Sequence, residues 1–169
     1  MAHIAFGSNI DPEENIPKAL EMLDADCPIT ALSTVYWSPP EGNREQPPFL
    51  NGACSVKNSW DARKLKFDVL RSIERRLGRV RGNDKYAPRT IDLDIALFGG
   101  AVIQEPDLVA PDPDIETRPF LALPLYELLP QGVLPGSGLP LADIVNRLDV
   151  STLKAHEALS LRLKKRFIA

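Results

Sequence analysis

Hydrophobic and polar positions follow two different periods along the chain, and these periods predict a defined order of strands and helices. Residues 2–7 are mostly apolar and end at a Gly-Ser-Asn sequence, which predicts a short first strand. The apolar positions between residues 16 and 23 then have the spacing of an amphipathic helix. Because Pro17 fits best in the first turn of a helix, we expect this helix to begin near Asn15.

The middle of the chain predicts two strands, a second helix and a fourth strand. A proline-rich loop separates the two strands, so we expect them to pair antiparallel. Asp61 is a typical N-cap residue and Gly78 is a typical helix terminator, which together bound the helix. The predicted ranges are residues 31–38 and 49–56 for the strands, 39–48 for the loop, 61–78 for the helix and 90–98 for the fourth strand.

The order strand, helix, strand, strand, helix, strand is typical of an α+β, ferredoxin-like fold, in which helices pack on one face of an antiparallel sheet. Residues 99–103 predict a turn and a short return strand. Further helices are expected at residues 119–129, 141–148 and 151–167. We expect a single domain over residues 1–169, with a core at 1–140 and a C-terminal helical tail at 141–169.

Composition and charge exclude several classes of protein. The hydrophobic content of 44% and charged content of 25% are ordinary for a globular domain, and the net charge of −3 indicates no general affinity for nucleic acid or membranes. No apolar run is long enough to span a membrane, and signal-peptide features are missing, so we expect a cytoplasmic protein. Cys27 and Cys54 lack metal-site spacing and are expected to be reduced.

Two carboxylates interrupt the fourth predicted strand, in the sequence RTIDLDIALFGG at residues 89–100. Asp92 and Asp94 are two residues apart and therefore share one face of the strand. Two neighbouring carboxylates repel each other unless a cation lies between them, and Mg²⁺ takes a few carboxylate oxygens beside water and phosphate. The alternative is an edge strand with its polar face in water. The opposite, buried face is expected to carry Ile91, Leu93, Ile95 and Leu97.

A basic segment precedes this strand. Between residues 71 and 89 there are seven basic residues and two acidic ones, which indicates either a solvated helix face and loop or an anion site. Arginine binds phosphate oxygens in pairs, and a loop beside a magnesium site suits phosphoryl transfer. The glycines at 78 and 82 are not followed by Lys-Ser/Thr, which argues against a P-loop kinase.

Six short motifs give the chain a specific resemblance: GSN, SPP, QPPFLN, IERRLGRVR, YAPRTIDLDIALFG and RPFLALPL, in this order between Ile4 and Pro130. They resemble the 6-hydroxymethyl-7,8-dihydropterin pyrophosphokinase family of folate biosynthesis. The resemblance implies a ferredoxin-like monomer with two Mg²⁺ ions. It also implies transfer of the terminal diphosphate of ATP to the hydroxymethyl oxygen of the pterin, with release of AMP.

The resemblance also implies roles for individual residues. Asp92 and Asp94 would bind metal, and Asp94 also lies where a carboxylate accepts the proton of the substrate hydroxyl. The loop arginines Arg79 and Arg89 would act on the phosphates as catalytic residues. The nucleotide candidates are Arg71, Glu74, Arg81, Tyr86, Ile95, Asp112 and Arg118. The pterin candidates are Ser38, Pro39, Glu41, Phe49, Asn51 and Phe120, with the two phenyl rings stacking on the flat substrate.

Some residues have a simpler structural explanation, and some depart from the family pattern. Phe49 and Phe120 are compatible with an ordinary core, Asn51 with an amide satisfied by the backbone, and Glu74 with a surface ion pair. The departures are Asp112 where histidine is frequent, Ala87 where glycine is usual, and Tyr86 where some members have tryptophan. Two alternatives to a pyrophosphokinase remain. One is a non-catalytic homologue that binds nucleotide or pterin, and the other is a nucleic-acid-binding module.

Overall fold

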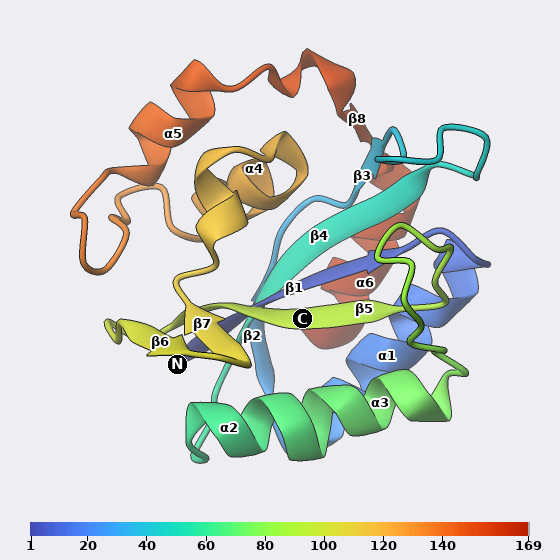
Figure 1. Ribbon diagram of the computed structural model, residues 1–169, viewed down its shortest axis with the longest axis horizontal. Helices are drawn as coiled ribbons and strands as arrows, with labels where there is room; N and C mark the ends of the chain where they lie inside the picture. The colour runs from blue at the N-terminus through green and yellow to red at the C-terminus, as the bar shows by residue number, and fades with distance from the viewer. Residues whose placement is uncertain (169) are drawn as a thin grey trace.

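The computed structural model describes residues 1–168 and is built on one antiparallel sheet (Figure 1). The strands lie in the order β5-β1-β4-β3-β8, and β2 also pairs with β4. The four predicted strand positions therefore lie side by side in the order fourth, first, third, second, which confirms the α+β class. The strand bounds are β1 Ala2–Ser8, β2 Ile29–Leu32, β3 Tyr36–Ser38, β4 Phe49–Val56, β5 Asp92–Phe98 and β8 Lys154–Ala155.

Helices pack on both faces of the sheet, so the expectation of helices on one face is wrong. One apolar cluster joins α1, α3 and α6 to the large side chains of the strands, such as Ile4 and Leu93. A second cluster joins α4 and α5 to small strand residues, including Ala53 and Ala96. The helical bounds are α1 Pro12–Asp26, α2 Ala62–Lys64, η1 Leu65–Leu70, α3 Arg71–Arg76, η2 Pro113–Glu116, α4 Pro119–Leu128, α5 Leu141–Arg147, η3 Val150–Thr152 and α6 Glu157–Phe167.

The alternation of strand β5 is broken once, by a bulge. Ile4 of β1 pairs with Ile95, but the next residue, His3, pairs with Leu97, so Ala96 is the extra residue. Beyond the bulge the side chains change faces, and Ala96 and Leu97 both lie in the second cluster. The prediction that Leu97 lines the same face as Ile95 is therefore wrong, because a strict period of two does not continue through a bulge.

Helix α1 begins at Pro12, three residues before the predicted start, and Pro17 lies inside it. A proline has no N–H to donate to the carbonyl four residues earlier, which here belongs to Glu13. Arg162 of α6 donates to that carbonyl at 3.1 Å instead. The C-terminal segment thus supplies the partner that the helix lacks. Helix α6 itself begins at Glu157, later than predicted, after η3 and β8.

The strand predicted at residues 31–38 is divided into β2 and β3 by an irregular segment, residues 33–35. Side chains from the C-terminal half bind the backbone there: Thr34 N–H donates to Glu127 at 2.7 Å, and Val35 N–H donates to Ser160 Oγ at 2.8 Å. The break therefore leaves neither amide unpaired.

The remaining predictions agree with the structure more closely. Strand β4 and the start of α4 have the predicted bounds, and the Asp61 side chain accepts from Lys64 N–H at 2.8 Å as an N-cap. A π-helical segment, η1, interrupts the second helix and was not predicted. The return strand is β6 Ile103–Glu105, which pairs with β7 Leu108–Ala110 rather than with β5. Within residues 1–168, no helix is both long and apolar enough for a membrane span.

Candidate functional site

A pocket of about 420 Å³ opens at the end of the sheet where β1, β4 and β5 meet the loops. It lies between the sheet and the N-terminal end of α4, which Arg118 precedes as the N-cap. Many of the predicted site residues line this one pocket: Ser38, Pro39, Glu41, Phe49, Asn51, Tyr86, Arg89, Asp92, Asp94, Asp112, Arg118 and Phe120.

A second, smaller pocket of about 250 Å³ shares Arg89, Asp92 and Asp94 with the first. It is lined by the arginine loop, which we define as residues 79–89, including Arg79 and Arg81. The two acidic side chains of β5 therefore stand between two compartments, one with aromatic walls and one with guanidinium walls. Arg71 and Glu74, which were also predicted, line neither pocket and instead contact each other next to Asp94. The side chain of Ile95 is buried in the core.

Phe49 and Phe120 lie on β4 and α4 and give the larger pocket its aromatic character. Both are partly exposed, unlike ordinary core phenylalanines. A guanidinium group lies near each ring: Arg89 Cζ is 5.7 Å from the centre of Phe49, and Arg118 Cζ is 6.0 Å from that of Phe120.

Asn51 has a side-chain partner rather than a backbone partner. Its Nδ2 donates to Ser38 Oγ at 2.5 Å, across the β3–β4 pair. Gly7 of β1 lies directly opposite Asn51, and a Cβ atom added there would be 2.6 Å from Asn51 Oδ1. Glycine at position 7 is thus required for this amide position, a requirement that the sequence analysis missed.

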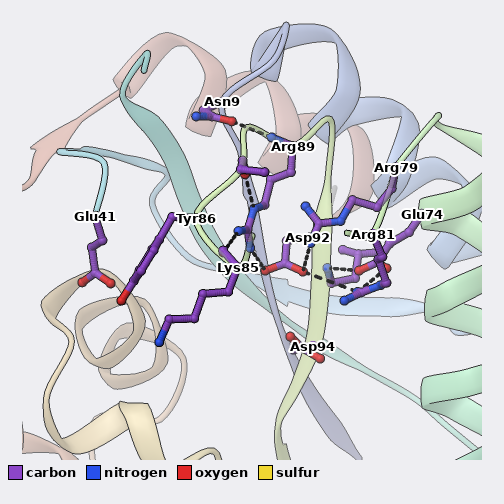
Figure 2. A network of polar contacts seen from close by, with 12 residues as sticks. Asn9, Glu41, Glu74, Arg79, Arg81, Lys85, Tyr86, Arg89, Asp92 and Asp94 are labelled. Carbon is purple, nitrogen blue, oxygen red and sulfur yellow. Dashed lines mark hydrogen bonds and ion pairs between the residues drawn. The ribbon is translucent and has the colours of Figure 1, made fainter. Parts of the chain in front are cut away.

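Asp92 faces the arginine loop (Figure 2). Its carboxylate lies 3.1 Å from Arg89 Nη1, 3.8 Å from Arg81 Nη2 and 3.9 Å from Arg79 Nη2. These groups come from residues 3 to 13 positions earlier in the chain, and the loop brings them to one oxygen pair. The result is a local excess of positive charge, which suits a polyanionic ligand.

Asp94 has a different environment from Asp92. Its Oδ1 accepts from Arg71 Nη2 at 3.0 Å, so its arginine partner lies on α3 rather than in the arginine loop. Burial raises the pKa of Asp94, repulsion from Asp92 raises it further, and Arg71 opposes both effects. A cation between the two carboxylates would relieve this repulsion.

Glu74 is buried, with its side chain 1% exposed, so the surface ion pair considered above does not describe it. Its Oε1 accepts from Leu93 N–H at 2.9 Å and from Arg71 at 3.0 Å, and its Oε2 accepts from Arg81 at 2.6 Å. Because Leu93 N–H lies on the open edge of β5, this carboxylate joins helix α3 to the strand. Glu74 therefore holds two arginines in place.

Arg79 is the most enclosed guanidinium of the loop, and its Nε is buried without a hydrogen-bond partner. Burial lowers the pKa of Arg79, Asp92 raises it, and the neighbouring Arg89 and Arg81 lower it again. An arginine surrounded by other arginines and lacking a partner at Nε is suited to an anion with several oxygens.

Asp112 is half-buried and serves as the N-cap of η2, where it accepts from Asp114 N–H at 2.9 Å. Burial raises the pKa of Asp112 to about 6, an effect that the hydrogen bond from Asp114 N–H opposes. The carboxylates of Asp114 and Asp94 raise the pKa further, and Lys66 lowers it. This chain thus has at position 112 a carboxyl group whose pKa lies close to the ordinary value of a histidine.

Replacing Asp112 by asparagine should stabilise the protein in a pH-dependent way. The folded protein holds the Asp112 proton more tightly than the unfolded chain, so this group costs stability as the pH rises from about 4 to 6. Asparagine keeps the N-cap and has no charge to bury. We expect the variant to match the natural protein at pH 4 and to exceed its free energy of unfolding by about 2–3 kcal/mol above pH 7.

Urea unfolding at several pH values, in EDTA and without nucleotide, measures this difference. Asp143→Asn, which changes an exposed carboxylate of α5 that does not act on Asp112, is the matched control. A difference for Asp112→Asn that is constant across pH 4–8 would contradict the assignment.

Lys85, one of the seven basic residues of the segment before β5, lines both pockets with its loop. Two further residues at the site carried no earlier prediction. Asn9 and Gln46 lie behind the loops and are buried, with 3% and 8% of their surfaces exposed. Asn9 and Gln46 belong to the GSN and QPPFLN motifs, but as single amides they carried no chemical signal in the sequence.

The carboxylate pair fits Mg²⁺ that is shared with a phosphate ligand. Within residues 1–168, no group of three or more His, Cys, Asp or Glu side chains gathers as a metal site. Mg²⁺ does not need such a cage, since it keeps several waters and binds one or two carboxylates beside substrate oxygens. Asp92 and Asp94, close to arginines that bind phosphate, are a donor set of this kind.

An antiparallel sheet bearing paired carboxylates between an aromatic pocket and an arginine cluster is suited to metal-assisted transfer of phosphate groups to a flat acceptor. Residues 3–130 match the model of the 7,8-dihydro-6-hydroxymethylpterin-pyrophosphokinase family. The chain belongs to this family.

Individual relatives agree with the family match. The chain is 36% identical over 139 residues to the 2-amino-4-hydroxy-6-hydroxymethyldihydropteridine pyrophosphokinase of Haemophilus influenzae, covering 80% of this chain and 86% of the relative. It is 37% identical over 142 residues to the enzyme of the same name from Pseudomonas aeruginosa, covering 82% and 86%. It is 37% identical over 134 residues to the enzyme of the same name from Bacillus subtilis, covering 78% of this chain and 79% of the relative.

Proposed function

We propose that this protein transfers the diphosphate of ATP to the hydroxymethyl group of 6-hydroxymethyl-7,8-dihydropterin and releases AMP, as a step of folate biosynthesis. The hydroxymethyl oxygen forms a bond to the β-phosphorus of ATP, and the bond between that phosphorus and the α,β-bridging oxygen breaks. AMP leaves with the bridging oxygen. The family membership and the names of the relatives support this reaction.

The observation that carries the proposal is the position of the two carboxylates of β5. Asp92 and Asp94 line both pockets, so groups bound in the two compartments meet at these side chains. The aromatic compartment suits a planar heterocycle, and the guanidinium compartment suits a triphosphate. An acceptor hydroxyl and a phosphate chain held in this way are close in space, which is the main requirement of phosphoryl transfer.

Phe49 and Phe120 stack on the two faces of the pterin ring, and Asn51 reads its edge. One N–H of Asn51 Nδ2 donates to Ser38, so its second N–H and its Oδ1 provide a donor and an acceptor for the pterin edge. Ser38, Pro39 and Glu41 present backbone groups of the proline-rich loop to the same edge of the pterin.

Arg79 and Arg89 contact the phosphates and neutralise the charge that develops on their oxygens. Arg81 and Tyr86 extend this contact from the same loop, and Arg118 contributes from the N-cap of α4. Arg71 and Glu74 support these groups from behind. Arg71 keeps Asp94 in place at 3.0 Å, and Glu74 keeps Arg71 and Arg81 in place.

Ile95 contributes through its backbone. Its side chain is 4% exposed and belongs to the core. Leu93 bonds to Glu74 and Arg71 through its backbone at the open edge of β5, and backbone groups alternate along a strand, so those of Ile95 also face that edge. Asp112 lies near the same place, where an acid instead of the usual histidine alters the contact to the nucleotide.

Asp92 and Asp94 would hold the two Mg²⁺ ions that we propose as cofactors. When bound, the metal would neutralise the phosphates and orient them for displacement. Asp94, which lines both pockets, also accepts the proton of the substrate hydroxyl. All of these residues come from one chain, and we propose that the protein acts as a monomer.

The non-catalytic alternative receives no support, because the relatives named above are pyrophosphokinases. The nucleic-acid-binding alternative is opposed by the net charge of −3 and by the carboxylates within the basic site.

Mixing the purified protein with ATP, Mg²⁺ and the hydroxymethyl dihydropterin should produce AMP and pterin diphosphate in equal amounts. Chromatography of the nucleotides and pterins measures both products. Formation of ADP instead, or binding of both ligands by calorimetry without AMP, would contradict the proposed reaction.

A further inference from the structure

Two buried amides, Asn9 and Gln46, connect the loops on either side of the site. Asn9 follows β1, and Gln46 lies in the proline-rich loop of residues 39–48. Asn9 Nδ2 donates to Gln46 Oε1 at 2.7 Å and to Pro47 O at 3.2 Å, and Gln46 Nε2 donates to the backbone oxygen of Tyr86 at 2.8 Å. We call Asn9 and Gln46 the amide pair.

Within the amide pair, Asn9 binds both the backbone N–H and the backbone oxygen of Arg89. Asn9 Oδ1 accepts from Arg89 N–H at 2.8 Å (Figure 2). In return, the backbone N–H groups of Asn9 and Ile10 donate to Arg89 O at 3.1 and 3.2 Å. The guanidinium of Arg89 then lies 3.1 Å from Asp92. The backbone of Arg89 is thus fixed by three hydrogen bonds, two of them to the buried residue Asn9 and one to Ile10.

These hydrogen bonds form a chain with one direction. The oxygen of Tyr86 only accepts, so Gln46 must present Nε2 to it and Oε1 to Asn9. Asn9 must then present Nδ2 to Gln46 and Oδ1 to the Arg89 N–H. Turning either amide over would set two acceptors or two donors against each other. The position of Tyr86 therefore determines which atom of Asn9 faces Arg89.

The proline-rich loop and the arginine loop also touch directly. A Cβ atom added to Gly42 would lie 2.5 Å from Cγ of Tyr86, so the tyrosine ring packs on the glycine backbone. Glu41, beside Gly42, forms an ion pair with Arg118 across the mouth of the larger pocket. The loop that carries Gln46 thus also borders the aromatic compartment.

We infer that the amide pair is a positioning device, through which occupation of the aromatic compartment strengthens phosphate binding by Arg89. A pterin that contacts Ser38, Pro39 and Glu41 restricts the motion of the proline-rich loop. The hydrogen bonds of Gln46 and Asn9 then restrict the motion of Arg89 as well. The effect is reciprocal, because a coupling free energy between two sites acts equally in both directions. This inference rests on the proposed function and names the residues that couple its two substrates.

The coupling is measured as a ratio of two dissociation constants. The probe is an ATP analogue with a methylene group between the α- and β-phosphorus atoms, titrated with Mg²⁺ by calorimetry, with and without the hydroxymethyl dihydropterin. In the natural protein we expect the pterin to tighten binding of the analogue by at least about fivefold. Equal affinities in the two titrations would overturn the inference.

Variants of Gln46 separate coupling from simple stability. Gln46→Ala removes both links, and Gln46→Glu keeps an acceptor for Asn9 but removes the donor to Tyr86. Both should reduce the pterin-induced tightening to about twofold or less, while affinity for the analogue alone stays within about twofold of the natural protein. A purely structural role would lower the melting temperature without changing the ratio, and that result would also overturn the inference.

Asn9→Ala, which removes the acceptor for Arg89 N–H, should lower kcat about tenfold or more at saturating substrates, because Arg89 is no longer fixed over the phosphates. The control is Asn58→Ala, since Asn58 is an amide that bonds only within its own turn, to Trp60. It should leave the ratio and kcat unchanged. Formation of AMP by the natural protein in the same assay tests the proposed function separately.

Discussion

Replacing Asp94 by alanine is expected to reduce AMP formation by at least about a thousandfold. The substitution removes one of the two carboxylates that we propose to hold the metal, and the group that we propose to accept the substrate proton. The fold should survive, because Asp94 lies on the pocket face of β5, while Leu93 and Ile95 on the other face hold the strand to the core. Arg71 keeps Glu74 and the Leu93 carbonyl as partners.

Steady-state kinetics with saturating Mg²⁺, together with a thermal melt, measures both parts of this prediction. Asp143→Ala, at an exposed position in α5, is the matched control and should have the activity of the natural protein. Removing Mg²⁺ with EDTA should abolish the activity of both the natural protein and this control. An Asp94→Ala variant that folds and retains more than a tenth of the activity would refute the metal assignment.

Replacing Glu74 by alanine is expected to destabilise the protein by about 3 kcal/mol and to lower its activity as well. The carboxylate is 1% exposed and accepts from Leu93 N–H, Arg71 and Arg81. Without it, a backbone N–H at the edge of β5 has no partner, and two guanidinium groups of the site lose the oxygen that orients them. The cost is larger than for a surface ion pair because the position is closed to water.

Urea unfolding measures the change, and Glu74→Gln separates its parts. Glutamine keeps an oxygen for Leu93 N–H but presents an amide to Arg81, so its stability should lie between those of the natural protein and Glu74→Ala. Glu14→Ala, which alters an exposed acid in α1, is the control and should change the stability by less than about 0.5 kcal/mol. Equal stability of Glu74→Ala and the natural protein would show that the buried network is not needed.

The order of strands and helices was predictable because the chain's hydrophobic periods are strong and its helix ends have typical residues. Strand β4 and the cap at Asp61 agree with the predictions for this reason. The errors arose where distant segments satisfy the backbone. Helix α1 contains Pro17, and Arg162 binds the carbonyl of Glu13 that the proline leaves without a helical partner. That partner lies 149 residues away and leaves no local signal.

The same limit applies to the site. The alternation of Asp92 and Asp94 in an apolar strand placed both carboxylates on one face, which the shared pockets confirm. The metal ions and substrates that would bind there stay predictions. Local patterns left the environment of Glu74 open, because burial depends on how α3 packs against β5. The roles of Gly7, Asn9 and Gln46 could not be predicted either, since the role of an amide or a glycine depends on which groups lie opposite it in the folded protein.

The sequence by itself determined the class of the fold, the acidic strand beside the arginine loop, and the family. These depend on residue type and spacing along a few turns or strands, which short-range sterics and hydrophobic burial translate directly into structure. Only the tertiary structure decided that helices cover both faces of the sheet, that a bulge turns Leu97 to the second face, and that a directional chain of amides fixes Arg89. Each of these depends on hydrogen bonds or packing between segments far apart in the chain, and such pairings are settled only when the whole core forms.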